Sequence, residues 1–332
     1  MFLYKGVLFM MKKTSTLAIS FTLVSALAVT GVHASPLTGS KDNTCTSSPT
    51  PMSSTSVTAA SATTAKSTEA QLAKNKKLVL NMYKDVFNDH ELNKTSLYIA
   101  SNYKQHNPLA GDGRQAFVKF FGSYLKQNPN YKSEVKRIIA QNDLVVVHNH
   151  VTTGAKDRGS SVVDIFRIKN NKIVEHWDVF QPVPEKSANT NTMFPAKGTP
   201  VEVTPLSPSE VQANAKMVRT FYDDLFNKHD VSVINKYVAE DYIQHNPSVP
   251  TGREPLNQFA SFLQSNKSSS NKIIRVIAEG DIVVLHSWSR MDKNDRGSAV
   301  VDIFRVANGK IVEHWDTVQA VPEKSANKNT MF

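Results

Sequence analysis

Two aspartates stand in the middle of apolar stretches, where a charged side chain is unusual. The stretch VVDIFR occupies residues 162–167 and recurs without change at residues 300–305. Alternation along a strand places Asp164 on the same face as Phe166. Burying a carboxyl among apolar side chains is costly unless it is hydrogen-bonded, hydrated or protonated, and such burial raises its pKa. Asp164 and Asp302 are therefore candidates for a general acid or base that works near neutral pH.

The two aspartates belong to a repeat that covers most of the chain. Residues 70–194 align with residues 209–332, and the paired phrases include MYKDVFNDH with FYDDLFNKH, YKQHNP with YIQHNP, and KIVEHWD in both copies. A unit of about 120 residues is longer than the repeats of solenoid proteins and has the size of a whole domain. The sequence therefore predicts two domains, 68–194 and 208–332, joined by a Pro-rich linker at 195–207.

The N-terminal residues have the pattern of a secretory signal peptide. Lys12 and Lys13 precede a mostly apolar stretch at residues 17–29, and Val32-His33-Ala34 offers a small-residue cleavage site. We expect residues 1–34 to be removed by cleavage near Ala34, so that the domains are secreted or periplasmic. An uncleaved membrane anchor is the alternative, but the apolar stretch is short for a bilayer span. We therefore expect no stable membrane insertion after cleavage.

Composition bounds the remaining possibilities. Residues 35–67 are dominated by Ser, Thr, Ala and Pro, which predicts a disordered spacer. Cys45 is the only cysteine, so no intramolecular disulfide can form. The net charge of +10 comes from 39 basic and 29 acidic residues that are scattered along the chain. This scatter favours a solvated basic surface, and we expect no nucleic-acid partner.

Each domain begins with helix signals and ends with strand signals. Ser207, Pro208 and Glu210 form a capping box with proline at the first helical position. Apolar runs separated by turn residues fill the second half of each repeat, and Asn308-Gly309 is a strong hairpin signal. Helices followed by an antiparallel meander indicate an α+β fold. Thr68 with Gln71 caps the first helix of domain 1, further helices are expected at 92–100, at 231–239 and after Gly113 and Gly252, and hairpins at 169–172 and 307–310.

The order of these elements, with the YxQHNP, VVDIFR and KIVEHWD phrases, resembles the SnoaL-like branch of the nuclear-transport-factor-two-like superfamily. The terminal phrase PEKSANxNTMF resembles a bacterial subgroup described as aldol-condensation enzymes. The resemblance covers both domains nearly end to end. It implies two tandem cone-shaped domains, each a curved antiparallel sheet closed by about three N-terminal helices around a pocket.

The resemblance also implies an activity. In polyketide cyclases of this fold an aspartate on the corresponding strand acts as acid or base for an enol or enolate. Asp164 and Asp302 would then transfer protons on a small apolar or aromatic carbonyl compound, in an aldol condensation, cyclisation or isomerisation, without a cofactor. The expected catalytic partners, able to hydrogen-bond an oxyanion or orient the aspartate, are His106, His245, His148 and His286. The expected substrate-binding residues are Trp177, Trp315, Tyr83, Tyr222, Phe166, Phe304, Gln181 and Gln319.

The same residues also have structural interpretations. Asp164 could form a structural pair with a neighbouring His or Arg, and His106 could cap the turn that follows it. His176, between Glu175 and Asp178 in the sequence, could equally lie at a surface or edge. The Asn-rich tails SANTNTMF and SANKNTMF are expected to close their own domains, with Phe194 and Phe332 packing against the helices.

A metal site is a weaker alternative. His148-Asn149-His150 places two imidazoles on one strand face, a pattern that zinc accepts. The second copy has His286-Ser287-Trp288 instead and lacks the second imidazole. We therefore expect no metal site that is shared by both domains.

Two classes of protein remain after these exclusions. The first is a cofactor-independent acid/base enzyme, and the second is a non-catalytic module that binds a small molecule or a protein with the same cone. Single-domain members of the superfamily commonly pair through their sheets. We therefore expect the two domains of this chain to pair internally as a pseudo-dimer.

Overall fold

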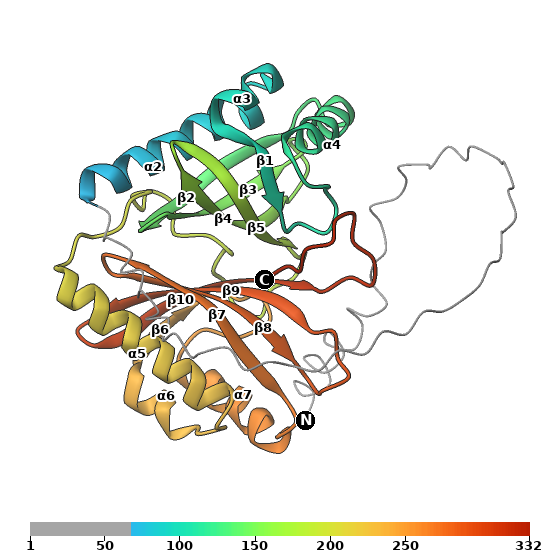
Figure 1. The fold of residues 1–332 in the computed structure, drawn as a ribbon. Helices are drawn as coiled ribbons and strands as arrows, with labels where there is room; N and C mark the ends of the chain where they lie inside the picture. The colour runs from blue at the N-terminus through green and yellow to red at the C-terminus, as the bar shows by residue number, and fades with distance from the viewer. Residues whose placement is uncertain (1–67) are drawn as a thin grey trace, which may run out of the picture. The chain divides into compact units, whose positions relative to one another are not determined.

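The computed structural model describes residues 68–332, which carry both copies of the repeat (Figure 1). The expected signal peptide, spacer and Cys45 lie outside the described residues. Both copies belong to one compact unit, Lys66–Phe332. Among residues 68–332 no helix is both long and apolar enough to cross a bilayer.

In domain 1 the helices precede the first strand in the chain, except for one helix that lies between the first and the second strand. Thr68 caps the first helix by accepting a hydrogen bond from the backbone N–H of Gln71, as the sequence predicts. The helices are α2 (Glu69–Met82), its π-helical continuation η1 (Tyr83–Asn88), η2 (Leu92–Lys94), α3 (Thr95–Tyr98) and α4 (Arg114–Gln127). The strands are β1 (Ile99–Gln105), β2 (Lys132–Gln141), β3 (Leu144–Thr152), β4 (Ser160–Lys169) and β5 (Lys172–Pro182).

Domain 2 repeats this arrangement. Its first helix begins with the expected capping box, in which the Ser207 hydroxyl accepts from the Glu210 N–H and the Glu210 carboxylate accepts from the Ser207 N–H. The helices are α5 (Pro208–Phe226), α6 (Ser232–Tyr237) and α7 (Arg253–Ser265). The strands are β6 (Val238–Gln244), β7 (Ser270–Glu279), β8 (Ile282–Arg290), β9 (Ser298–Ala307) and β10 (Lys310–Ala320).

Each domain has one five-stranded sheet, ordered β1-β5-β4-β3-β2 and β6-β10-β9-β8-β7. The hairpins expected at residues 169–172 and 307–310 are present, and Asn170, Asn171, Asn308 and Gly309 take the positive φ angles that such two-residue turns need. The expectation of a purely antiparallel sheet needs one correction. The first strand of each sheet runs parallel to the last, so both sheets are mixed.

Both faces of each sheet are buried, but by different partners. In each domain the helices cover one face (Figure 1). In domain 1 the helix-covered core includes Val145, Val147 and Phe166. The opposite face packs against the other domain, because Val163, Ile165 and Trp177 of domain 1 share one apolar cluster with Val301, Ile303 and Trp315 of domain 2. Buried apolar surface of this kind is the main force that holds two sheets together.

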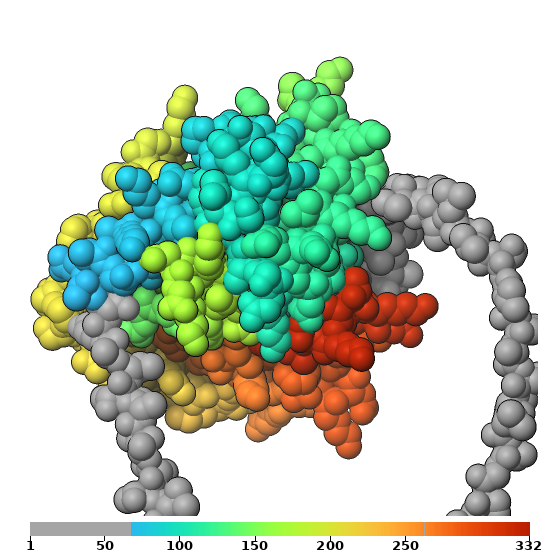
Figure 2. Space-filling view, turned by 45° about the horizontal axis from the view of Figure 1, so that its top comes forward, coloured from blue at the N-terminus to red at the C-terminus, as the bar shows by residue number. Residues whose placement is uncertain are grey.

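The Asn-rich tails cross between the domains, which corrects the expectation that each tail closes its own domain. The side chain of Asn327, in the domain 2 tail, donates to the carbonyls of Asn107 and Ala110 in domain 1, each at 2.7 Å. The side chain of Asn189, in the domain 1 tail, donates to the carbonyls of Asn246 and Val249 in domain 2, each at 2.7 Å. Figure 2 shows the red C-terminal segment against the teal loop that follows β1.

The tail phenylalanines were also expected against helices, and this is corrected as well. The Phe194 ring lies 5.4 Å from the His148 ring and 4.5 Å from the His150 ring, both on β3. The Phe332 ring lies against His286 and Trp288 on β8 in the same way. The helices leave this face of each sheet uncovered, so the tail phenylalanines can pack against it.

Candidate active site

Asp164 lies on the helix-covered face of β4 and is saturated with hydrogen bonds. The Tyr83 hydroxyl donates to its Oδ2 at 2.5 Å, and the side-chain amide of Asn149 donates to the same oxygen at 2.8 Å. The His176 Nε2 lies 2.8 Å from its Oδ1. Three partners from η1, β3 and β5 therefore compensate the cost of burying this carboxyl.

His176 lies between two carboxyl groups rather than at a surface. Its Nδ1 lies 2.9 Å from Oε1 of Gln105, and because an amide oxygen only accepts, Nδ1 must carry a proton. The Asp164–His176 bond then needs a second proton, either on Nε2 or on the carboxyl. Burial opposes the imidazolium, but the bond to Asp164 and the negative charge of Asp178 outweigh it and raise the pKa of His176. The cationic form of His176 is therefore favoured.

Asp178 completes the cluster and is the least satisfied of the three groups. It pairs with Asp164 across β4 and β5, so both carboxyls face the same side. The Asn107 side chain donates to its Oδ2 at 2.6 Å, whereas its Oδ1 is buried without a partner among the described residues. Burial raises the pKa of Asp178 to about 6, the charge of His176 opposes this, and the charge of Asp164 adds to it. A carboxyl with this pKa can gain and lose a proton near neutral pH.

The cluster is enclosed but not sealed. The side chains of Asp164 and His176 remain 12% and 9% exposed, whereas Val163 and Ile165 on the opposite face of the same strand are completely buried. Tyr83 and Phe166 border the cluster, with their rings 6.2 Å apart, and Phe166 stacks on His176 at 4.8 Å. The cluster thus keeps a small exposed area beside two aromatic rings, while Oδ1 of Asp178 is itself buried.

Domain 2 reproduces the cluster with Asp302, His314 and Asp316. The Tyr222 hydroxyl donates to Asp302 at 2.7 Å, and His314 lies 3.0 Å from the other carboxyl oxygen. Burial raises the pKa of Asp316 to about 6, the charge of His314 opposes this, and its Oδ1 is again buried without a partner among the described residues. Ser287 stands where domain 1 has Asn149, and it contacts Tyr222 instead of the aspartate. The two sites therefore share their titratable groups.

The structure brings only part of the expected site together. Tyr83, Tyr222, Phe166 and Phe304 lie beside the aspartates in the helix-covered cores, as expected of substrate-binding residues. The remaining expected residues lie on the opposite face of the sheets or at the domain interface and do not contact the aspartates: His106, His245, His148, His286, Trp177, Trp315, Gln181 and Gln319.

The contacts of these residues explain their placement. His106 bonds to Glu175 at 3.0 Å and stacks on Trp177 at 4.8 Å, and its Nδ1 donates to the carbonyl of Thr330 in the other domain. His148 bonds to the Ser161 hydroxyl at 3.0 Å, and Gln181 accepts from the Val318 N–H of domain 2 at 2.9 Å. The matching residues of domain 2 have contacts of the same kind. His245 bonds to Glu313 and stacks on Trp315, and His286 bonds to Arg275. Gln319 accepts from the Phe180 N–H of domain 1.

One physical reason accounts for all of these corrections. Strand alternation divides polar residues between two faces, but it does not say which residues share the face of the aspartate cluster. Asp164 pairs with Val147 on β3, so the neighbouring His148 faces away from it. The same geometry separates His148 and Asp164 as metal ligands, and His150 instead lies 2.8 Å from the carbonyl of Arg158.

In each domain the aspartate–histidine–aspartate cluster is a second place where ligands for a cation lie close together. The nearest ligand atoms of Asp164, His176 and Asp178 all lie within 4.8 Å of one another, and the same holds for Asp302, His314 and Asp316. A metal ion bound there would have to replace the aspartate–histidine hydrogen bond in each domain. Proton transfer uses the cluster with those bonds intact.

Family models match both halves of the chain. The model described as SnoaL-like polyketide cyclase matches residues 77–185, and the model described as SnoaL-like domain matches residues 218–314. The chain carries two SnoaL-like domains in tandem. Each SnoaL-like domain is an α+β domain with a five-stranded mixed sheet and covering helices. The resemblance inferred from the repeated phrases is therefore confirmed.

Several solved structures are similar to one SnoaL-like domain. An NTF2-like protein from Mesorhizobium loti is 22% identical, covers 36% of this chain and 100% of its own, and has a TM-score of 0.31. A SnoaL-like protein from Burkholderia thailandensis is 16% identical and covers 33% of this chain and 97% of its own, with a TM-score of 0.29. TsrD from Streptomyces laurentii is 20% identical and covers 34% and 91%, with a TM-score of 0.28. The search of curated proteins gave no match.

The sequence interpretation missed Asp178 and Asp316 as site residues. Both stand in the repeated phrase KIVEHWD, two positions after His176 and His314, so strand alternation places each on the same face as its histidine. Their register partners are the two aspartates that the sequence did single out. The signal was therefore present, but only the pairing of the strands shows that the two phrases meet.

Proposed function

We propose that each SnoaL-like domain is a cofactor-independent acid/base catalyst that moves a proton next to a carbonyl group. The observation that supports this proposal best is the paired cluster, in which Asp178 and Asp316 each have a pKa of about 6 and one unpartnered oxygen. A buried carboxyl of this kind matches the task of a general base near neutral pH. The proposed substrate is a small apolar or aromatic carbonyl compound.

The proposed roles follow from the contacts. The free Oδ1 of Asp178 takes the proton from the carbon next to the carbonyl, and returns it to the product. The charge of His176 beside it favours the ionised state of Asp178 that a base requires, and His176 is itself held by Asp164 at 2.8 Å. The Tyr103 hydroxyl accepts a bond from Gln105 at 3.0 Å, and burial and the charges of Asp178 and Asp164 raise its pKa. A neutral Tyr103 hydroxyl can donate a hydrogen bond to the enolate oxygen.

A second candidate function is a small-molecule binding module without chemistry. The observation in its favour is the complete saturation of Asp164 by Tyr83, Asn149 and His176, which is the pattern of a structural group. This alternative and the enzyme proposal differ in what Asp178 does. A binding module would bind a carbonyl compound without exchanging its protons.

The experiment measures exchange of the protons next to a carbonyl group. The purified chain is incubated in D2O with a panel of small ketones, aldehydes and β-dicarbonyl compounds, and deuterium uptake is followed by NMR. We expect uptake above the rate in buffer with at least one compound. The double variant Asp178→Asn and Asp316→Asn should lower the rate by about 10²- to 10⁴-fold, the usual contribution of a general base.

A matched control is available in the chain. Asp241 is exposed on β6, and its counterpart in domain 1 is Asn102, so Asp241→Asn copies a residue that the fold already accepts. This variant should exchange protons at the rate of the unmodified chain. Equal rates for the double variant and the unmodified chain would rule the proposal out, and tight binding without exchange would support the binding module.

We also propose that the domains act outside the cytoplasm. The support is the Lys12-Lys13 pair, the apolar stretch and the small-residue site at Ala34. Expression of the full sequence in a bacterial host followed by N-terminal sequencing of the periplasmic fraction tests this. A mature chain that begins at Ser35 is expected, and an uncleaved chain in the cytoplasm would contradict it.

A further inference from the structure

Each catalytic cluster is linked by hydrogen bonds to the tail of the opposite domain. In domain 1 the end of β1 and the loop that follows it carry Gln105 and Asn107, and this segment is called the Gln-His-Asn loop. The Gln105 side chain accepts from His176, and the Asn107 side chain donates to Asp178. The two side chains are coupled, because the Asn107 N–H donates to Oε1 of Gln105 at 2.9 Å. This loop therefore fixes both titratable partners of Asp164.

The backbone of the same loop is held by the domain 2 tail. Asn329 donates to the Gln105 carbonyl at 2.8 Å, Asn327 donates to the Asn107 carbonyl at 2.7 Å, and the Ala326 N–H donates to the Pro108 carbonyl at 2.7 Å. These contacts satisfy loop carbonyls that have no partner in a strand or helix. The side chains of the loop hold the cluster and its backbone holds the tail.

The arrangement is reciprocal. In domain 2, Gln244 accepts from His314 at 3.0 Å and Asn246 donates to Asp316 at 2.5 Å. The domain 1 tail holds their backbone, with Asn191 donating to the Gln244 carbonyl at 2.9 Å and Asn189 to the Asn246 carbonyl at 2.7 Å. The repeated phrase SANxN is thus used twice, each time on the other domain.

We propose that Asn327 and Asn329 are positioning residues for the domain 1 cluster, and that Asn189 and Asn191 are positioning residues for the domain 2 cluster. Neither pair touches the reacting groups. Each acts through the Gln-His-Asn loop of the opposite domain. The two sites are therefore each incomplete without a segment of the other domain, and the internal pairing of the domains is a condition for both.

The test uses the crossed pattern. Asn327→Ala with Asn329→Ala loosens the domain 1 loop, and Asn189→Ala with Asn191→Ala loosens the domain 2 loop. The readout is the pKa of Asp178 and Asp316, from the ¹³C shifts of the carboxyl carbons during a pH titration. We expect the first variant to raise the pKa of Asp178 above about 6 and to leave Asp316 unchanged, because the bond from Asn107 is one that lowers it. The second variant should do the reverse.

Matched controls separate positioning from folding. Lys328→Ala changes an exposed residue of the same tail and should alter neither pKa, and near-ultraviolet circular dichroism confirms that each variant is folded. A single Asn327→Ala change serves if the double variant does not fold. A shift of Asp316 with the domain 2 tail variant, or equal shifts of both aspartates, would overturn the proposal.

This proposal rests on the proposed function, but the titration tests it without measuring any activity. Activity gives a second readout in chains with one remaining base, Asp316→Asn or Asp178→Asn. The domain 2 tail variant should reduce proton exchange roughly ten- to a hundredfold in the Asp316→Asn chain and leave it unchanged in the Asp178→Asn chain. A loss of this size is typical when a catalytic group is slightly displaced. If no substrate is exchanged by any variant, the crossed pKa shifts still decide whether the tails position the clusters.

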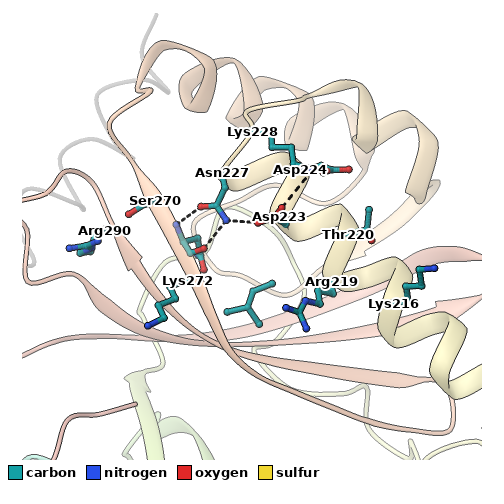
Figure 3. A pocket seen from close by; sticks show the side chains of 12 residues that line it. Lys216, Arg219, Thr220, Asp223, Asp224, Asn227, Lys228, Ser270, Lys272 and Arg290 are labelled. Atoms are coloured by element: carbon teal, nitrogen blue, oxygen red, sulfur yellow. Dashed lines mark hydrogen bonds and ion pairs between the residues drawn. The ribbon is translucent and has the colours of Figure 1, made fainter. Parts of the chain in front are cut away.

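A different observation carries a second proposal, which concerns a surface cleft in domain 2. The cleft lies between α5 and the strands β7 and β8, and has a volume of about 540 Å³ (Figure 3). Its cationic residues are Lys216, Arg219, Lys228, Lys272 and Arg290, and its acidic residues are Asp223 and Asp224. Lys228 is neutralised by Asp224 at 2.6 Å. The other four cations form no ion pair among the described residues.

The matching cleft of domain 1 serves as an internal comparison. Leu80, Glu134 and Thr152 line it where domain 2 has Arg219, Lys272 and Arg290. Its two cations, Lys84 and Lys132, are matched in number by two carboxylates, Asp89 and Glu134, and Lys84 pairs with Asp89 at 2.5 Å. The excess of positive charge is therefore a property of the domain 2 cleft and not of the fold.

We propose that the domain 2 cleft binds a small molecule through a carboxylate or phosphate group. Arg219 and Arg290 suit such groups, because a guanidinium bonds to two oxygens at once. Asn271 also lines the cleft; its Oδ1 is buried without a partner among the described residues, and its amide donates to the Tyr222 hydroxyl at 3.0 Å.

The test measures binding of inorganic phosphate and citrate by calorimetry and by ¹⁵N NMR. We expect the shifts to map to α5 and β7, and at least a tenfold loss of affinity in Arg219→Leu with Lys272→Glu, which installs the domain 1 residues. The reverse changes Leu80→Arg and Glu134→Lys should create binding in domain 1. Lys267→Ala, outside the cleft, is the control. Shifts scattered over all surface lysines, or an unchanged affinity in the first variant, would overturn the proposal.

Discussion

Asp178 lies directly across from Asp164 in the register of β5 and β4, and both carboxyls face the helix-covered core. The two groups differ in how far they are satisfied. Asp164 has a hydrogen-bond partner on each oxygen, whereas Asp178 has a partner on one oxygen only. Two neighbouring carboxyls in unlike surroundings are the usual sign of a division of roles, in which one orients and the other reacts.

The pH dependence of proton exchange follows from this division. The base must be ionised, and burial together with Asp164 raises the pKa of Asp178 to about 6 while His176 opposes the shift. We therefore expect kcat/KM to be low below pH 5 and to rise through about pH 6 to a plateau. The measurement is the rate of deuterium uptake between pH 4.5 and 8. A profile that is flat over this range, or that falls as pH rises, would contradict the assignment of Asp178 and Asp316 as bases.

Removing the hydroxyl that bonds to Asp164 should destabilise domain 1. Tyr83→Phe leaves a buried carboxyl short of one donor, and we expect a loss of about 1.5–3 kcal/mol in the free energy of unfolding, measured by urea denaturation. Tyr98→Phe is the comparison, because the Tyr98 hydroxyl also donates to a carboxyl at 2.5 Å, that of Asp85. Asp85 keeps Lys84 and Lys94 as neighbours, so the loss there should be smaller. Equal losses would mean that burial of Asp164 is not what makes its bond to Tyr83 important.

Much of the fold could be predicted from the sequence because local signals agree with it. The capping box at Ser207 and the Asn-Gly hairpin at 308–309 are local features, and each has the predicted structure. The repeat itself gave the two-domain organisation. These elements depend on residues that are neighbours in the chain, and such signals are the most reliable part of a sequence interpretation.

The site could be predicted only in part because it depends on which face of the sheet carries the aspartate cluster. In domain 1 the histidines and the tryptophan were assigned to the pocket, since they are large or polar and occur on apolar strands. A second buried face, against the other domain, accounts equally well for His148 and Trp177. No local pattern distinguishes two buried faces of one sheet. The crossing of the tails is also beyond sequence periodicity, because it is set by the pairing of the domains.

The apolar face of each sheet predicts how a single domain would behave. A chain shortened to residues 68–206 would expose Val163, Ile165, Trp177 and Val179, all fully or almost fully buried in the intact protein. An exposed patch of this kind drives association. We expect the shortened chain to form dimers or larger species in light scattering, and we expect the intact chain to be a monomer. A stable monomer of the shortened chain would contradict the internal pairing of the domains.

Acid should weaken the protein through His148 and His286. Burial, with Arg137 beside the first and Arg275 beside the second, lowers the pKa of each imidazole to about 3, from an unfolded value near 6.5. The folded state binds fewer protons than the unfolded state between these values. The stability that these two groups contribute is therefore complete above pH 6.5 and is lost as pH falls toward 3. Asp178 and Asp316 act in the opposite direction, because their raised pKa contributes stability that is lost as pH rises through about 6.

The contribution of the histidines can be isolated by comparing slopes. Replacing His148 by Gln removes one proton-linked group, so the slope of unfolding free energy against pH between 4 and 6 should decrease by up to about 1.4 kcal/mol per pH unit. The double variant with His286→Gln should lose up to twice as much of the slope. His150→Gln is the control, since it removes the half-buried imidazole two residues further along the same strand. Urea denaturation at several pH values gives all four slopes. If His148→Gln and His150→Gln have the same slope, the imidazole at the domain interface is not what makes the protein sensitive to acid.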